Sequence, residues 1–402
     1  MRRAIVICVV IAAFGAAAPA HARPYWKKQL DGLTRDHRIG VALRDEGKVL
    51  YERDARTKRT PASNEKLLLS MALFDKVNPN EGIATRVFGN AMRIGGVVTG
   101  DVWLSGQGDP SISVGGSYGR YLPFNPTRLG RLARAVKDAG ITEIRGHVLG
   151  NKGYFKHDWF APGWRYYFPG SQVALPTALT FNGNIYRGRA IRNPEYRLAA
   201  VFTRKLEAAG VDVNKRPGSG WMSGGKAVLA EVRSRPLSTL VRYMNRTSSN
   251  FFAEVLGKRL GAESRGAPGT IAKGANAIER FADRVGVTLT AKDSSGLSYR
   301  NRVSPRGMTK LLGYVEDNAP WHQTLRQGLP TGGQGTLENR LHGVPIRAKT
   351  GSLSGVSALS GWIYLRQTGS WAEFSILSRG LSYYGAKSIE DRIVRVIQRL
   401  AR

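Results

Sequence analysis

Ser63 and Lys66 stand three residues apart at the start of a strongly apolar stretch. Pro61 suits the first turn of a helix, because its fixed φ and missing N–H cost nothing where the amides are unpaired anyway. Residues 67–74 are apolar at every position but one, so we expect this helix to be buried on nearly all sides. Side chains three residues apart share a helix face, so the Lys66 amine can reach the Ser63 hydroxyl. The pattern predicts a nucleophile beside its general base.

A serine hydroxyl attacks only when a neighbour takes its proton, and a lysine does so only when burial or nearby positive charge lowers its pKa. The apolar helix supplies burial, and a helix start points backbone N–H groups at a developing oxyanion. The spacing is weak evidence by itself, because it recurs at Ser223 and Lys226, where two intervening glycines indicate a loop. Alone, it favours a helix cap at Ser63 and a solvated Lys66.

Two further short motifs lie later in the chain. Ser248-Ser249-Asn250 falls in a polar break between helices expected at residues 236–244 and 251–260. Lys349-Thr350-Gly351 opens a run of strands that continues through residues 357–364 and 370–378. Each motif has a plainer interpretation. Ser248 or Asn250 suits a helix N-cap, Asn250 especially, and the glycine suits a bulge at a strand start.

The first 22 residues have the pattern of a secretory signal. Arg2 and Arg3 precede an apolar core, and Ala20-His21-Ala22 is a small-residue cleavage site, so we expect export to the periplasm or cell-wall space after cleavage behind Ala22. An uncleaved membrane anchor is the alternative. Cys8, the one cysteine, would leave with this segment. The mature protein then depends on a large apolar core rather than on disulfides.

The chain is strongly basic, with 61 Lys and Arg against 29 Asp and Glu and a net charge of +32. The excess is spread along the chain without a single long basic run. For an exported protein, such a charge indicates anionic envelope polymers or a membrane surface rather than nucleic acid, which we do not expect as a partner. A generally basic proteome in the source organism is an equally good explanation.

The order of expected helices and strands along the chain predicts an α/β (α+β) fold with an insertion. Strands expected at residues 39–44 and 48–51 lead into the Ser63 helix, and the helical texture returns from residue 236. Between them, residues 78–235 alternate short β-prone runs with Gly, Pro and Asn turns, interrupted by helices expected at 126–139 and 198–209. We therefore expect a catalytic domain at residues 23–77 plus 236–402 and an inserted β-rich domain at 78–235.

Two stretches carry open alternatives. An aromatic cluster in residues 154–168 suits either a sugar-stacking surface or, more often, core. The last helix, expected at residues 388–402, has an apolar face opposite a row of arginines. Packing on a sheet is the plainer interpretation, and lying on an anionic membrane is the other.

The three motifs, in this order and in these settings, resemble the signature of the penicilloyl-serine transferases. More narrowly, the chain resembles the class C low-molecular-mass penicillin-binding proteins, which are serine D-alanyl-D-alanine carboxypeptidases and endopeptidases. The resemblance covers nearly the whole mature chain and includes residues 60–63, 100–104, 108–110, 178–182, 293–298, 301–305 and 335–337. It implies a β-lactamase/transpeptidase-like catalytic domain carrying a mostly β insertion, acting on peptidoglycan stem peptides and acylated by β-lactam antibiotics.

The resemblance also implies roles for the motif residues. Ser63 attacks the penultimate D-Ala carbonyl while neutral Lys66 takes its proton, and Ser248 passes a proton to the leaving amine with support from Lys349. The substrate-binding residues are implied to be Asn250, Thr350, Gly351 and Ser352, and the backbone N–H groups of the oxyanion hole those of Ser63 and Ser352.

Two departures from the family pattern stand out. Ser249 stands where aspartate is usual, and the insertion is shorter than in the larger members.

Rival functions fit less well. A histidine triad lacks a nucleophile elbow, because residues 355–359 have no closing glycine. A zinc peptidase would need a paired-histidine helix, which is absent, and we expect neither metal nor cofactor. A β-lactamase or esterase of the same fold, or a non-catalytic envelope-binding protein, remains the alternative, and sequence does not separate carboxypeptidase from endopeptidase activity.

Overall fold

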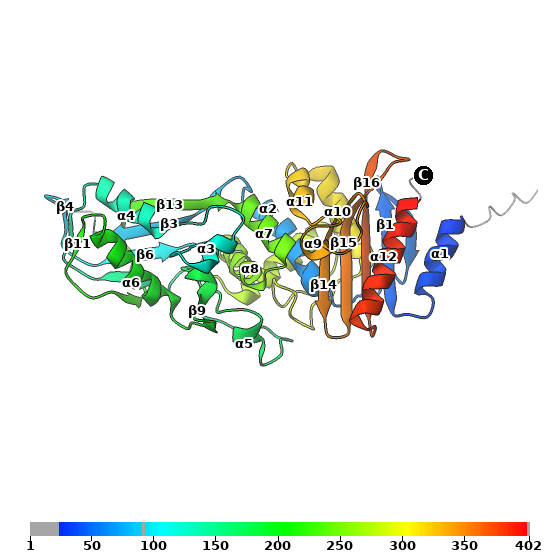
Figure 1. The fold of residues 1–402 in the computed structure, drawn as a ribbon, viewed down its shortest axis with the longest axis horizontal. Coiled ribbons are helices and arrows are strands. Elements are labelled where there is room, and N and C mark those ends of the chain that lie inside the picture. The colour runs from blue at the N-terminus through cyan, green and yellow to red at the C-terminus, as the bar shows by residue number, and fades with distance from the viewer. Residues whose placement is uncertain (1–23, 91–92, 400–402) are drawn as a thin grey trace, which may run out of the picture.

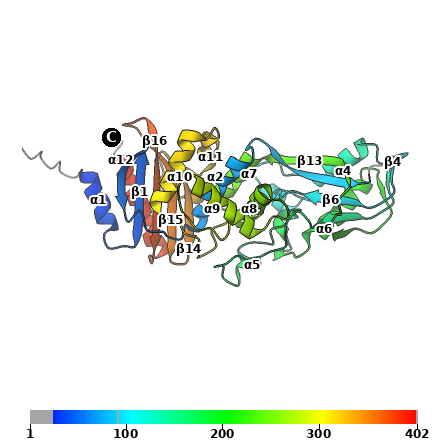
Figure 2. The same ribbon diagram turned by 180° about the vertical axis from the view of Figure 1, so that it is seen from behind.

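The computed structural model describes residues 24–90 and 93–399. The molecule is elongated, with the first and last elements side by side at one end and β4 at the other (Figures 1 and 2). The expected signal segment with Cys8, and its cleavage site, lie outside the described residues. Within the described part, no helix is both long and apolar enough to cross a membrane. The mixed helix and sheet content confirms the predicted fold class.

An antiparallel sheet of five strands, in the order β14-β15-β16-β1-β2, joins the two ends of the chain. Its strands are β1 (Ile39–Asp45), β2 (Lys48–Arg53), β14 (Ile346–Leu353), β15 (Val356–Leu365) and β16 (Ser370–Arg379). Side chains alternate across the sheet, as a period of two requires. On β15, Ala358 and Trp362 join the core on one face, and Leu359 and Ile363 join the core on the other.

Helices cover both faces of this sheet. One face carries α1 (Tyr25–Thr34) and α12 (Tyr383–Arg399), whose Ile393 and Ile397 are buried. The C-terminal helix therefore packs on the sheet, the plainer of its two interpretations. The other face carries α2 (Glu65–Lys76), α7 (Leu237–Thr247), α8 (Asn250–Arg265), α9 (Ile271–Arg284), α10 (Pro305–Asn318) and α11 (His322–Gly328).

The segment between α2 and α7 builds a second body of strands. It opens with β3 (Gly82–Gly89) and closes with β13 (Ala227–Pro236), and these pair antiparallel. They belong to a sheet ordered β12-β8-β6-β3-β13, and a smaller sheet is ordered β11-β7-β5-β4. The other strands are β4 (Arg93–Ile94), β5 (Val97–Val98), β6 (Val102–Gly106), β7 (Glu143–Ile144), β8 (Val148–Asn151), β11 (Asp212–Val213) and β12 (Gly218–Gly220), with a separate hairpin of β9 (Ile185–Tyr186) and β10 (Arg189–Ala190).

Helices α4 (Leu129–Asp138) and α6 (Pro194–Glu207) share an apolar core with these sheets, and α3 (Ser117–Tyr121) and α5 (Phe168–Ser171) are short. The amide of Leu237 donates to the Glu81 carbonyl at 2.8 Å, and that of Ser238 to the Pro79 carbonyl at 2.8 Å. The segment therefore leaves and rejoins the rest of the chain at one place. A domain division at residues 78 and 235 stays a prediction consistent with this geometry.

Element boundaries differ from expectation in several places, and two of the differences have a clear local cause. The β-prone run at residues 97–105 is broken between β5 and β6, where the Asp101 carboxylate accepts from the His147 amide at 2.8 Å. The last helix begins at Tyr383 rather than residue 388, because Ser382 Oγ accepts from the Gly385 amide at 3.2 Å and supplies a cap.

Candidate active site

Ser63 lies in a turn of 3₁₀ helix, Ala62–Asn64, directly before α2. Ala62 has a φ of +46°, a left-handed conformation that non-glycine residues rarely adopt. The backbone of Gly296 lies against this residue so closely that a Cβ there would stand 1.9 Å from the Ala62 oxygen. Close packing thus holds the backbone just before the nucleophile in a conformation that the chain would not choose alone.

The Lys66 amine is fully buried and contacts three oxygens. Its Nζ lies 3.0 Å from Ser63 Oγ, 2.9 Å from Asn250 Oδ1 and 2.5 Å from the Ser295 carbonyl. Burial lowers the pKa of Lys66 to about 8, although nearby carboxylates, including Asp293, act in the opposite direction. A neutral amine has two N–H groups and one lone pair. It can therefore donate to Asn250 and Ser295 and accept from Ser63.

Acidic side chains beneath Lys66 fix this arrangement. Glu254 on α8 accepts from the Ser294 and Ser295 amides at 3.1 and 2.7 Å, which holds the Ser295 carbonyl toward Lys66. Burial, with the negative charge of Asp293, raises the pKa of Glu254 to about 8. Asp293 in turn accepts from Trp164 Nε1 at 2.6 Å.

The junction between α7 and α8 presents the second motif. Ser248 ends α7 with a φ of +56°, and Ser249 caps α8 by accepting from the Phe252 amide at 3.3 Å. The N-cap is therefore Ser249, and the interpretation of Ser248 or Asn250 as that cap is wrong. The middle serine works where aspartate is usual because either side chain accepts a capping hydrogen bond. With the cap supplied, Ser248 and Asn250 are free to bond the two lysines.

Strand β14 brings the third motif to the nucleophile. Lys349 is fully buried, and its Nζ donates to Ser248 Oγ at 3.0 Å. Burial, followed by the positive charges of Lys66 and Lys387, lowers the pKa of Lys349 well below its usual value. A Cβ on Gly351 would stand 3.0 Å from the Ser63 amide nitrogen, so the strand passes directly against the nucleophile.

The remaining predicted residues lie on the same strand. Thr350 Oγ1 donates to Thr336 Oγ1 at 2.8 Å, and Ser352 is exposed with its Oγ bonded to the Gly351 carbonyl at 2.8 Å. The structure thus brings all eight predicted residues to one place. Thr336 was not among the predicted binding residues, although it lies in a segment that resembles the family.

A buried cation behind β14 was also missed. Lys387 on α12 donates to the Gly351 carbonyl at 3.2 Å and to Ser357 Oγ at 2.7 Å, and pairs with Glu390 at 3.3 Å. Glu390 also meets Arg340, with Nη2 and Oε2 2.9 Å apart. In the sequence Lys387 and Glu390 look like an exposed helical ion pair, so nothing local indicates a role behind the site.

Part of the β-rich segment closes the site from the other side. The Gln172 carbonyl accepts from Asn250 Nδ2 at 3.1 Å. The neighbouring aromatic cluster is divided. Phe155, Trp164 and Phe168 are buried as core, the favoured interpretation, while Phe160, Tyr166 and Tyr167 are exposed.

A serine bonded to a buried lysine, with a second serine–lysine pair and a strand against the nucleophile, defines a penicilloyl-serine transferase site. The chain matches the D-Ala-D-Ala carboxypeptidase 3 (S13) family over residues 27–187 and 175–400, and it belongs to that family. The predicted kinship with the class C penicillin-binding proteins is confirmed.

Individual relatives agree with this assignment. The D-alanyl-D-alanine carboxypeptidase of Actinomadura sp. (strain R39) is 26% identical, with 91% of this chain and 83% of the relative covered. Carboxypeptidase DacB of Mycolicibacterium smegmatis is 28% identical, with 86% and 77% covered. Penicillin binding protein 4 of Haemophilus influenzae has the same fold, with a TM-score of 0.77 at 19% identity and 93% and 99% coverage. A second structure of that protein holds a β-lactam.

Proposed function

We propose that this protein is a serine-type D-alanyl-D-alanine carboxypeptidase that acts on peptidoglycan stem peptides. The observation that carries the proposal is the 3.0 Å contact between Ser63 Oγ and the buried Lys66 Nζ, whose pKa is lowered to about 8. At pH 7 about one such amine in ten is neutral and ready to accept a proton. Few sites place a lysine of this kind beside a serine unless the pair reacts.

The reaction proceeds in two steps. Ser63 Oγ forms a bond to the carbonyl carbon of the penultimate D-Ala as its proton passes to Lys66. The backbone N–H groups of Ser63 and Ser352 stabilise the oxyanion. The carbon–nitrogen bond then breaks, Ser248 passes a proton to the leaving amine, and D-Ala departs. Water adds to the acyl-serine, releases the shortened peptide and restores the Ser63 hydroxyl.

The motif strand binds the substrate. Thr350 and Lys349 hold the terminal carboxylate, and Asn250 bonds the peptide amide. A carboxylate beside Lys349 favours the charged amine, so binding opposes the burial that lowers its pKa. Penicillin presents a similar carboxylate and amide and acylates Ser63. Hydrolysis of the resulting acyl-enzyme is slow, because the family lacks an efficient deacylating base. A cross-linked peptide supplies a different leaving group to the same chemistry, so endopeptidase activity is also proposed.

Release of free D-alanine tests the substrate assignment. A peptide ending in D-Ala-D-Ala should lose one alanine with the wild-type protein and none with Ser63→Ala. The same peptide ending in L-Ala-L-Ala is the matched control and should stay intact. Hydrolysis of simple esters or penicillins without D-alanine release would favour the esterase or β-lactamase alternative, and binding without any hydrolysis the envelope-binding alternative.

We also propose that the protein works outside the cytoplasm after removal of residues 1–22. The support is the signal pattern of Arg2, Arg3 and the Ala20-His21-Ala22 site, together with a substrate that belongs to the cell wall. Its net positive charge also suits anionic envelope polymers or a membrane surface. Mass spectrometry of protein recovered from the cell envelope should find a chain that begins at Arg23; an intact N-terminus would contradict cleavage.

A further inference from the structure

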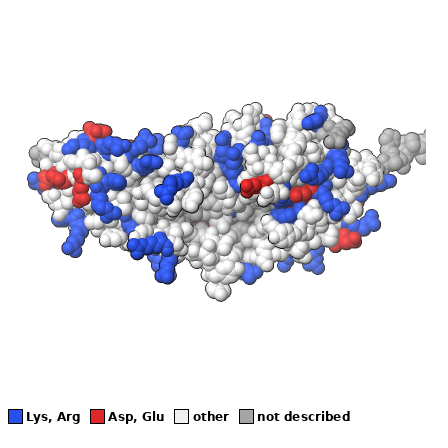
Figure 3. Space-filling view, viewed as in Figure 1, with Lys and Arg blue, Asp and Glu red and all other residues white. Residues whose placement is uncertain are grey.

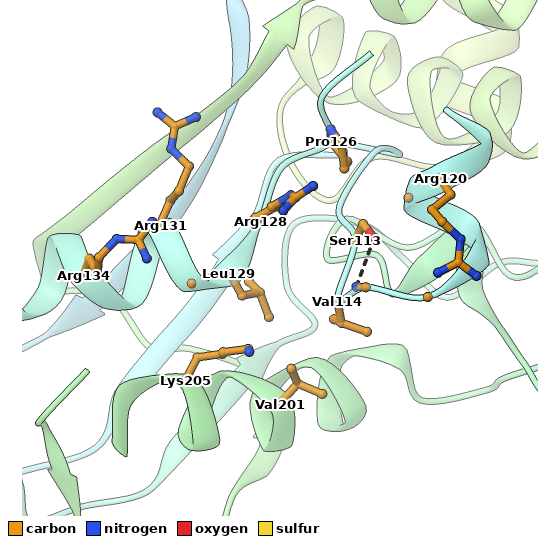
Figure 4. Close-up of a pocket in the computed structure, with 14 residues that line it drawn as sticks. Ser113, Val114, Arg120, Pro126, Arg128, Leu129, Arg131, Arg134, Val201 and Lys205 are labelled. Carbon is orange, nitrogen blue, oxygen red and sulfur yellow. Dashed lines mark hydrogen bonds between the residues drawn. The ribbon is translucent and has the colours of Figure 1, made fainter. Parts of the chain in front are cut away.

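A cavity of about 480 Å³ lies on the β-rich segment between α3, α4 and α6 (Figure 4). Five basic side chains line it: Arg120, Arg128, Arg131, Arg134 and Lys205. No acidic side chain is among its lining residues. In Figure 1 these helices lie in the half of the molecule away from β14. The cavity is therefore separate from the proposed active site.

None of the five cations has a partner within the described part of the chain: no ion pair and no side-chain hydrogen bond involves them, and all five are exposed. Other arginines of the same segment are paired, Arg86 with Glu231 at 2.5 Å and Arg145 with Glu143 at 3.2 Å. Like charges gathered without counter-charges repel one another. A bound anion would remove that repulsion.

The spacing of the arginines suits more than one anionic group. Arg131 and Arg134 lie three residues apart on one face of α4, and Arg128 stands directly before the first residue of that helix. A step of three residues rises about 4.5 Å along a helix, so Arg134 leaves the backbone one such step beyond Arg131. A guanidinium group presents a planar fork of donors that matches phosphate oxygens. The row therefore fits consecutive phosphate groups on one ligand.

Local backbone contacts hold this arrangement together. A bridge between Ser113 and Arg128 fixes the glycine loop at residues 113–116 beside the start of α4, and Ser113 Oγ accepts from the Gly115 amide at 3.2 Å. In Figure 4 the Arg128 and Lys205 side chains extend toward this loop. A second cavity of about 260 Å³ shares Arg128 and Arg131 and continues to Arg235 at the end of β13.

The two cavities together form a basic track, made of the five cations of the first cavity and Arg235 of the second. We propose that this basic track binds a polyanionic chain whose charges are phosphodiester groups. A continuous track across two cavities fits a chain better than a single ion. A membrane surface fits less well, because the site is concave and its apolar lining residues Val114, Leu129 and Val201 are half-buried or buried. Figure 3 shows basic side chains at both ends of the molecule. Attraction of a polyanion by the net charge alone is therefore the competing explanation, and the control variant must remove the same number of charges elsewhere. Given the proposed function, such binding would hold the enzyme close to its substrate in the wall.

The test measures binding of a fluorescein-labelled poly(glycerol phosphate) oligomer to the mature protein by anisotropy, across a range of salt concentrations. The triple variant Arg128→Gln, Arg131→Gln, Arg134→Gln should bind at least tenfold more weakly and show a shallower dependence of affinity on salt. The matched control removes three exposed arginines of another helix that have no ion pair among the described residues: Arg392→Gln, Arg395→Gln and Arg399→Gln on α12. That control should lose less than threefold.

Equal losses in the two triple variants would show binding by net charge and overturn the site. Absence of binding to the wild-type protein would overturn it as well, as would binding to phosphatidylglycerol vesicles without binding to the soluble oligomer. Acylation by penicillin should be the same in both triple variants and in the wild type. Measuring acylation separates the two proposals, because loss of polymer binding would leave the proposed carboxypeptidase activity untouched.

Discussion

At the scale of single residues, the proposed chemistry depends on a lysine that must lose its proton before it can act. Lys66 is surrounded by backbone, amide and carboxyl groups that fix its geometry, while burial supplies the shift in its pKa. The opposing carboxylates keep that pKa near 8 rather than lower. A pKa near 8 is a compromise: the amine is neutral in a useful fraction of molecules and is still basic enough to take the serine proton.

Acylation should therefore follow the protonation of Lys66. Because the base is the neutral amine, the rate of acylation of Ser63 by a fluorescent penicillin should rise about tenfold per pH unit below pH 8 and level off above it. Lys66→Arg keeps the positive charge but cannot deprotonate, and should slow acylation by about 10²- to 10⁴-fold. Stopped-flow kinetics between pH 6 and 9 measures both. A rate independent of pH, or an active arginine variant, would refute the assignment of the base.

The buried carboxyl group of Glu65 should make the stability of the protein depend on pH. Burial, and then the charges of neighbouring carboxylates, raise the pKa of Glu65 well above its usual value, and neither of its oxygens has a hydrogen-bond partner within the described residues. The native state keeps the Glu65 proton to a higher pH than the unfolded chain does, so the free energy of unfolding falls as pH rises above about 4.3.

Glu65→Gln removes this dependence while keeping the shape. Relative to the wild type, the variant should gain stability between pH 4 and pH 7, and urea unfolding at the two values measures the gain. A difference that stays the same at both pH values would mean that Glu65 is ionised in the folded protein.

At the scale of elements, β14 and α12 act together on the nucleophile. Gly351 lies against the Ser63 backbone, and Lys387 of α12 bonds the Gly351 carbonyl from behind. The strand is thus held between the nucleophile in front and a buried cation behind. The position of the strand would set the proposed oxyanion hole, because the Ser352 amide follows directly on the same strand.

Gly351→Ala should separate the strand from the nucleophile. The added Cβ would stand 2.8 Å from the Pro61 carbonyl oxygen and 3.0 Å from the Ser63 nitrogen, and backbone atoms yield less readily than side-chain ends. We expect acylation to slow by about 10²-fold, the effect of displacing reacting groups by about 1 Å. Gly224→Ala is the control, because no atom of the described residues lies within 4 Å of the position of its Cβ. Equal acylation rates in the two variants would contradict the close approach.

Lys387→Met should weaken the support behind the strand. The substitution removes a charged donor from the Gly351 carbonyl, a bond of a kind that contributes about 1.5–3 kcal/mol, so acylation should slow about tenfold or more. Arg392→Gln, an exposed position on the same helix, should change nothing. The penicillin acylation rate and the melting temperature are measured for each. A variant that loses stability but acylates at the wild-type rate would restrict Lys387 to folding.

The limits of prediction from sequence follow the same scales. The motif residues were predictable because each lies at a recognisable place: a helix start, a polar break between helices and a strand. Lys387 was not, because its position depends on a helix from the end of the chain packing behind a strand. Ser249 shows how a local rule fails narrowly, since the cap was expected but assigned one residue away. The start of α12 was also misplaced, because Ser382 caps the helix and the two tyrosines that follow it do not indicate a helix start.

At the scale of the whole molecule, the chain assembles the proposed active site from three distant segments. Residues 63–66, 248–250 and 349–352 meet because the sheet joins the two ends of the chain, β1 pairing with β16, while the β-rich segment leaves and returns at one place. That segment contributes Gln172 to the site and carries the basic track on its far half. The length of the insertion was visible in the sequence, but its return to the active site through residues 154–176 was not, because loops carry no periodic signal.

The central claim is that Ser63 is the nucleophile of an acyl-enzyme. Intact-mass spectrometry of the purified mature protein, with and without penicillin, tests it most directly. We expect one stable adduct with the mass of the whole antibiotic on the wild-type protein and none on Ser63→Ala. No adduct while the penicillin stays intact, or rapid destruction of the penicillin, would contradict it, the first pointing to a binding protein and the second to a β-lactamase.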